Sequence, residues 1–135
     1  MPRLRAIAHG QGPAPLRLRQ LFDALIAVKR RRAAEDPELF TAYRILAADA
    51  QPVVSAHIQE LVELAATVIR SGLEDGTIRS VDPVVAGKAV LFATSRFHHP
   101  AHSAEWADPG IDAAYNEVWQ LLMNGLCVPA EASSQ

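Results

Sequence analysis

Prolines placed near the starts of helices are the feature that most limits how this chain can fold. Pro37, Pro83 and Pro109 each follow an aspartate, and Pro52 follows a glutamine. An aspartate side chain can accept hydrogen bonds from the free N–H groups at a helix start. A proline fits the first helical turn because the N–H that it lacks would have no partner there. The sequence therefore predicts a new helix near each of these four pairs.

Between these breaks, apolar residues recur at spacings of three and four, which is typical of helices packed on one face. The pattern predicts five main helices, over about 14–34, 39–49, 52–75, 84–97 and 110–126. Gly76 is suited to the left-handed residue that ends the third of them. Because no segment alternates with a period of two, we expect an all-α fold, an antiparallel bundle in a single domain.

Composition narrows the classes of function. The chain of 135 residues is 50% hydrophobic and has a net charge of -2, and it contains no apolar run near the ~20 residues that a membrane span needs. We therefore expect a soluble protein with no membrane partner. A single cysteine, Cys127, cannot form an internal disulfide, which fits the cytoplasm. The net charge also argues against a surface that binds nucleic acid over its whole extent.

The last two predicted helices are apolar around most of their circumference. Large exposed apolar patches are rare on monomers, so these helices favour burial against a second copy of the chain. The alternative is that they form the centre of a single-chain bundle. The residues expected at the dimer interface are Ala86, Ala89, Ala93, Phe97, Ala114, Val118, Leu121, Leu122 and Gly125.

Four short stretches of sequence, together with the order and lengths of the helices, resemble those of a known family. They are VIRSGLEDGTIR at 68–79, VDP at 81–83, RFHHP at 96–100 and LLMNGL at 121–126. The stretch from about residue 3 to 126 resembles the C-terminal ligand-binding and dimerisation domain of the TetR family of bacterial transcriptional regulators. The resemblance implies a homodimer formed by the last two helices, and a small-molecule cavity in each subunit between the helices before them.

The resemblance also implies how the chain is divided. Residues 1–12 correspond to the end of a linking helix and a loop, 13–127 to the effector-binding and dimerisation domain, and 128–135 to a disordered tail. Members of the family bind DNA through an N-terminal helix-turn-helix unit, which we expect to be missing here. A fragment, a misplaced start and a stand-alone domain remain open. We expect no enzymatic activity and no cofactor.

A ligand pocket in such a domain should combine apolar walls with a few polar groups. Polar side chains on or beside apolar helix faces need partners, either within the core or from a ligand. The residues expected to line a pocket are Phe22, Phe40, Tyr43, His57, Leu61, Phe92 and Arg96. Such a set suits a mostly apolar effector with one polar or anionic group.

Three of the five histidines, His98, His99 and His102, stand close together around a proline. Imidazoles bind zinc and nickel, but the pairings typical of metal sites, such as HExxH or CxxC, are absent. We therefore expect a helix end, where histidine interacts favourably with the last carbonyls. A metal-binding helical protein and a dimerisation module without a ligand remain as alternatives. We also expect the basic run KRRR at 29–32 to be a solvated helix end.

Overall fold

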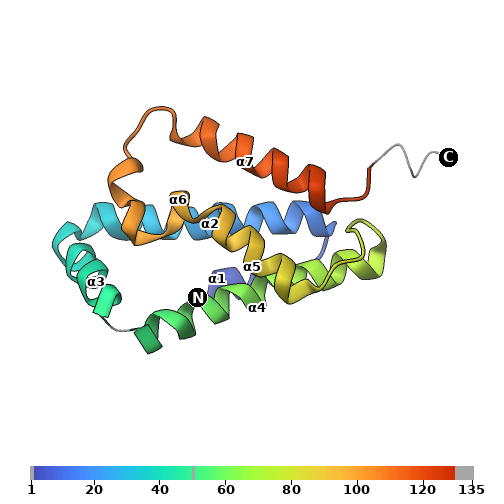
Figure 1. The fold of residues 1–135 in the computed structure, drawn as a ribbon, viewed down its shortest axis with the longest axis horizontal. Helices are drawn as coiled ribbons and strands as arrows, with labels where there is room; N and C mark the ends of the chain where they lie inside the picture. Colours follow the sequence, from blue (N-terminus) through green and yellow to red (C-terminus); the bar gives the residue numbers. More distant parts are fainter. Residues whose placement is uncertain (1, 50, 130–135) are drawn as a thin grey trace.

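The computed structural model describes residues 2–49 and 51–129, and Figure 1 shows their arrangement. The helices are α1 (Pro2–Ala8), α2 (Ala14–Glu35), α3 (Pro37–Asp49), α4 (Gln51–Asp75), α5 (Pro83–Ala93), α6 (Ser95–His98), the 3-10 helix η1 (Pro100–Glu105) and α7 (Ile111–Leu126). Within the described ranges there is no β-strand, only an isolated bridge between Ile78 and Cys127. The predicted all-α fold is confirmed. The tail predicted over 128–135 lies outside the described residues from 130 onward.

Several helix starts and ends follow the local signals in the sequence, whereas α7 begins at Ile111 after Gly110 without a side-chain cap, and Asp108 accepts the Gly110 N–H at 2.9 Å. The Asp82 carboxylate accepts hydrogen bonds from the backbone N–H groups of Val84 and Val85, both at 3.0 Å, and so caps α5. The Asp36 carboxylate accepts the N–H of Leu39 at 3.0 Å in the first turn of α3. Gly76 has a φ of 80°, the left-handed conformation expected after α4. Capping and chain reversal are therefore encoded locally.

The segment predicted as one helix over 84–97 is instead two helices. α5 ends at Ala93, and Thr94 has φ -100° and ψ 7°, outside the helical range. The Thr94 hydroxyl donates to the carbonyl oxygen of Val90 at 2.9 Å, a back-bond that bends helices. The chain then forms the short α6 and η1, which was not predicted. After this break, α6 and η1 lie in contact with α2.

The core lies where α2 and α5 each pack against α4 (Figure 1), and buried side chains of α1, α6 and α7 extend it. α5 approaches α4 closely at Gly87, where an added Cβ would lie 3.1 Å from the carbonyl oxygen of Val62 and 3.2 Å from the nitrogen of Ala66. Only glycine fits this crossing without displacing backbone. Gly87 therefore lies on the inward face of α5, together with the buried Val90 and Leu91.

Arg17 joins the N-terminal helix to the bundle. Its buried guanidinium donates to the carbonyl oxygen of Ala8 and, at 2.9 Å, to the Ser71 hydroxyl of α4. Arg5 of α1 also pairs with Glu60 of α4, at 2.8 Å. α1 is thus attached to both α2 and α4. No described helix is long and apolar enough to span a bilayer.

Candidate functional site

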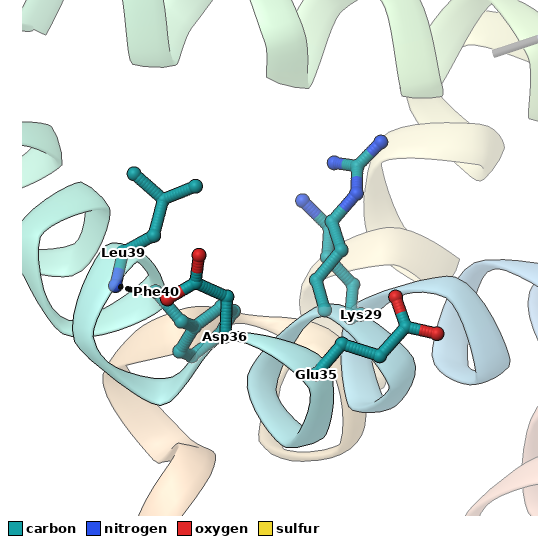
Figure 2. A pocket seen from close by; sticks show the side chains of 6 residues that line it. Lys29, Glu35, Asp36, Leu39 and Phe40 are labelled. Carbon is teal, nitrogen blue, oxygen red and sulfur yellow. Dashed lines mark hydrogen bonds between the residues drawn. The ribbon is translucent and has the colours of Figure 1, made fainter.

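A pocket of about 470 Å³ opens where α2 turns into α3, and α4 runs along its other side (Figure 2). Its volume falls in the range of sites for small organic molecules. The residues that line it are Lys29, Arg32, Glu35, Asp36, Leu39 and Phe40. They come from the last turns of α2 and the first turn of α3, so the sharp turn at Asp36-Pro37 creates the hollow.

One wall of the pocket is apolar. Leu39 is 65% exposed, and in Figure 2 its side chain faces Lys29 across the opening. Phe40 is buried beneath it, with its ring centroid 5.8 Å from that of Trp106 in the segment after α6. The Trp106 indole N–H donates to the carbonyl oxygen of Arg96 at 2.9 Å, which fixes this ring. Leu39 is an apolar side chain left in solvent at the mouth of a pocket.

The opposite wall carries a buried lysine. Lys29 is 4% exposed, and its Nζ lies 3.0 Å from Nε2 of His57 on α4. Burial, and secondarily the Arg32 charge, lower the pKa of Lys29 to about 8. Burial, and secondarily the Lys29 charge, lower the pKa of His57 to about 4. At neutral pH the ammonium group therefore donates a hydrogen bond to a neutral imidazole.

The predicted pocket residues divide into groups. Phe40 lines the pocket, and His57 adjoins it through Lys29. The side chain of Tyr43 lies outside the part of the chain that the structure describes. Phe22 and Leu61 belong to the core, where they line a void of only about 10 Å³, too small for an effector.

Two further predicted residues lie away from the pocket. Phe92 is 54% exposed, because the packing of Gly87 against α4 turns this position of α5 outward. The Arg96 Nε donates to a carboxylate oxygen of Glu105 at 2.9 Å, beside η1. Its guanidinium therefore already has an anionic partner within the chain.

Sequence reasoning missed Lys29 and Arg32 as site residues, because they belong to a run of four basic residues expected to be solvated. A signal was present, since Lys29 follows Leu25 and Ile26 at spacings of four and three and so continues the apolar stripe of α2. A lysine on such a stripe must either extend past the core or be buried. Here it is buried.

The histidines after α5 do not converge on one point. Nε2 of His98 lies 3.0 Å from the Thr94 hydroxyl, and burial lowers its pKa to about 4. Nδ1 of His99 accepts the N–H of Ala101 at 3.1 Å, and Nδ1 of His102 lies 3.2 Å from Glu105. Among the residues described, no three His, Cys, Asp or Glu side chains form a group that could hold a metal ion. α6 ends at His98, so these histidines stand at a helix end, as the sequence predicted.

A second hollow, of about 340 Å³, lies between α2 and α7. Its charged groups already pair with one another: Arg30 with Asp112 at 3.0 Å, and Arg19 with Asp23 at 2.9 Å. The Tyr115 hydroxyl donates to Asp23 at 3.0 Å. These bonds attach α7 to α2 and occupy most of the polar groups there, although the Nε of Arg30 is buried with no hydrogen-bond partner among the described residues. The pocket at the α2–α3 turn is larger and has an apolar wall, so it is the better candidate for a ligand.

Comparison with known families decides what kind of domain carries this pocket. A family model described as Tetracyclin repressor-like, C-terminal domain, matches residues 14–119. The chain belongs to this family. Domains of this family are parts of transcriptional regulators. No curated protein matches the chain. The matched range of this TetR-like domain runs from the start of α2 into α7, so it includes every residue that lines the pocket.

Proposed function

We propose that residues 13–127 form an effector-binding and homodimerisation domain of a TetR-like transcriptional regulator, with residues 1–12 and 128–135 outside it. A mostly apolar small molecule binds in the pocket between α2, α3 and α4, and the outer faces of α5 and α7 meet a second copy. Binding then acts by favouring one of two arrangements of the dimer.

The observation that carries the effector proposal is the pocket itself. It combines sufficient volume, an exposed leucine at its mouth and a buried cation in its wall. An exposed apolar side chain beside a hollow gains free energy when a ligand covers it, at roughly 25 cal/mol per Å² of apolar area removed from water. Few convergent polar groups in an apolar site are typical of small-molecule binding.

Binding of Nile red, a neutral apolar dye, tests this proposal. We expect the purified chain to bind it with saturable fluorescence, one molecule per subunit. Leu39→Glu should weaken binding about tenfold or more, because it places a charge at the mouth of the pocket. The control is Leu16→Glu, at another exposed leucine, 55% exposed near the start of α2, which should leave binding unchanged. Equal effects of the two variants would refute the assignment of the pocket.

The dimer proposal rests on large apolar side chains left in solvent. On α5, Val85 is 66% and Phe92 is 54% exposed; with Ala89 between them they follow the i, i+4, i+7 spacing of one helix face. On α7, Leu121 is 74% exposed, and Ala114, Val118 and Gly125 share its flank of the helix. Phe97, also expected at the interface, is only 1% exposed and belongs to the core of the subunit. A partner would therefore contact the exposed residues of α5 and α7 and not Phe97.

A further inference from the structure

The exposed apolar face of α5 carries one charge. Lys88 is the only charged residue of that helix, and its side chain is exposed. It stands three residues after Val85 and four before Phe92, so it projects from the same side as these two exposed side chains. Lys88 forms no ion pair and no side-chain hydrogen bond with any residue that the structure describes. Its charge is therefore available to a partner that covers this face.

The exposed flank of α7 carries one charge of the opposite sign. Glu117 stands three residues after Ala114 and four before Leu121, so it lies on the flank proposed for the interface. The other charged residue of α7, Asp112, already pairs with Arg30 at 3.0 Å. Glu117 has no such bond within the described part of the chain. The two helices of the proposed interface thus offer one cation and one anion.

These two charges limit how a second copy can lie on this surface. A partner that covers the apolar side chains removes water from Lys88 and Glu117, and a charge that loses water needs a partner of opposite sign. In a two-fold interface each contact occurs twice, with the residues exchanged between the copies. Placing α5 of one copy against α7 of the other joins lysine to glutamate at both places. Placing each helix against its own equivalent brings equal charges together.

We infer that Lys88 of each copy pairs with Glu117 of the other, and that these two ion pairs determine both the partner and the register of the dimer. This inference rests on the proposed dimer and names the residues that select its partner. Apolar side chains such as Val85 and Leu121 favour association but tolerate many arrangements, because hydrophobic burial has no direction. Complementary charges exclude the arrangements and the partners that bring like charges together.

Charge reversals test this pairing, with the dissociation constant of the dimer measured by light scattering and native mass spectrometry. In Lys88→Glu alone, and in Glu117→Lys alone, both contacts of the dimer become repulsive. We expect the dissociation constant of each variant to rise about tenfold or more, because two repulsive contacts replace two attractive ones. An equimolar mixture of the two variants should instead form a heterodimer, in which both contacts again join opposite charges.

A double variant and matched controls complete the experiment. The chain with both Lys88→Glu and Glu117→Lys should dimerise by itself, within about threefold of the unmodified dissociation constant, since both pairs are restored with their signs exchanged. Glu63→Lys and Arg70→Glu make the same changes of net charge at exposed positions of α4. Each control should dimerise as the unmodified chain does, and their mixture should show no preference for the heterodimer. Circular dichroism should give the same helical content for every variant, because all of these side chains are exposed.

The outcomes separate this inference from the proposed function. A monomer mass for the unmodified chain would overturn the dimer and the ion pairs together. A dimer whose dissociation constant is unchanged by either single reversal would overturn the ion pairs and leave the proposed dimer. Weakened single variants that neither mixing nor the double variant restores would also overturn the pairs, because the two side chains would then not face each other. Restoration in both the mixture and the double variant supports the ion pairs.

Discussion

At the scale of single residues, burial disfavours the charged form of Lys29 in the folded chain. Its pKa falls from 10.5 in the unfolded chain to about 8 in the folded one. The unfolded state thus holds the proton more tightly, and below pH 8 this difference lowers the free energy of unfolding. The difference disappears as the pH rises from about 8 to 10.5.

We therefore predict that Lys29→Met stabilises the ligand-free chain. The free energy of unfolding at pH 7, measured with urea, should rise by about 1–3 kcal/mol, because each pKa unit corresponds to ~1.36 kcal/mol. The gain should shrink toward zero as the pH approaches 10.5. Arg31→Met, at an exposed site, should change stability by no more than about 0.5 kcal/mol. A loss of stability in Lys29→Met would mean that its bonds outweigh the cost of burial.

His98 should make the fold sensitive to acid. Burial lowers its pKa from 6.5 to about 4, so between these values the unfolded chain binds a proton that the folded chain does not. Stability should therefore fall as the pH drops from 6.5 to 4, by up to about 3 kcal/mol from this residue. His98→Gln can keep a bond to Thr94 and cannot titrate. Urea unfolding at several pH values should show a shallower loss in this variant.

The exposed His9 provides the control for the acid experiment. His9→Gln should leave the pH dependence of stability unchanged. Some loss of stability at acid pH should remain in His98→Gln. The part that comes from a buried histidine should then be due to His57, whose pKa is also lowered to about 4. An identical acid profile in the unmodified chain and in His98→Gln would contradict the burial of a neutral His98.

At the scale of helices, the packing of α5 on α4 depends on Gly87. We predict that Gly87→Ala destabilises the chain by about 1–3 kcal/mol, although alanine is the better helix former, because the new Cβ meets backbone atoms of Val62 and Ala66. In Gly125→Ala on α7, nothing lies within 4 Å of the new Cβ, so stability should rise by up to about 1 kcal/mol.

Both glycine variants are best measured by urea unfolding in a Leu121→Glu background, where association does not contribute. Changes of opposite sign are expected. If Gly87→Ala were as favourable as Gly125→Ala, the close approach of the two helices would be refuted.

Local signals explain why most helices could be predicted and where prediction stopped. Turn signals such as Gly76 and the apolar spacing act over a few residues, so the bounds of α2, α4 and α7 were within about a residue of those expected. The orientation of α5 could not be predicted, because its sequence is apolar on nearly all sides and its inward face is decided by contacts with distant parts of the chain, such as that of Gly87 with α4. For the same reason Phe92 was expected in a pocket and lies outside.

The candidate site depended even more on packing between helices. Phe40 could be predicted as a wall of a pocket from its place on an apolar stripe. For Lys29 the only sequence signal was its place on the apolar stripe of α2. That place does not decide between a solvated and a buried lysine, because the burial depends on His57 of α4, 28 residues along the chain.

At the scale of the whole molecule, α2 connects the pocket with the proposed dimer surface. Lys29 faces the pocket, while the neighbouring Arg30 pairs with Asp112 at the start of α7. Two turns earlier, Asp23 accepts a hydrogen bond from the hydroxyl of Tyr115 on α7. A ligand that shifts the last turns of α2 would therefore also move α7, the helix that carries Leu121. Coupling between the two sites needs no contact beyond these.

The dimer itself gives the last prediction. Leu121→Glu should convert the dimer into a folded monomer, because the side chain is 74% exposed within one subunit and is buried only by a partner. Light scattering at tens of micromolar should give the mass of two chains for the unmodified protein and of one for the variant.

The melting temperature should rise with protein concentration only in the unmodified chain, since association stabilises by mass action. Ala113→Glu introduces the same charge at an exposed position on another side of α7 and should remain dimeric. A monomer mass for the unmodified chain would refute the dimer. A dimer mass for Leu121→Glu would place the interface elsewhere, because no other apolar side chain named on α7 is as exposed.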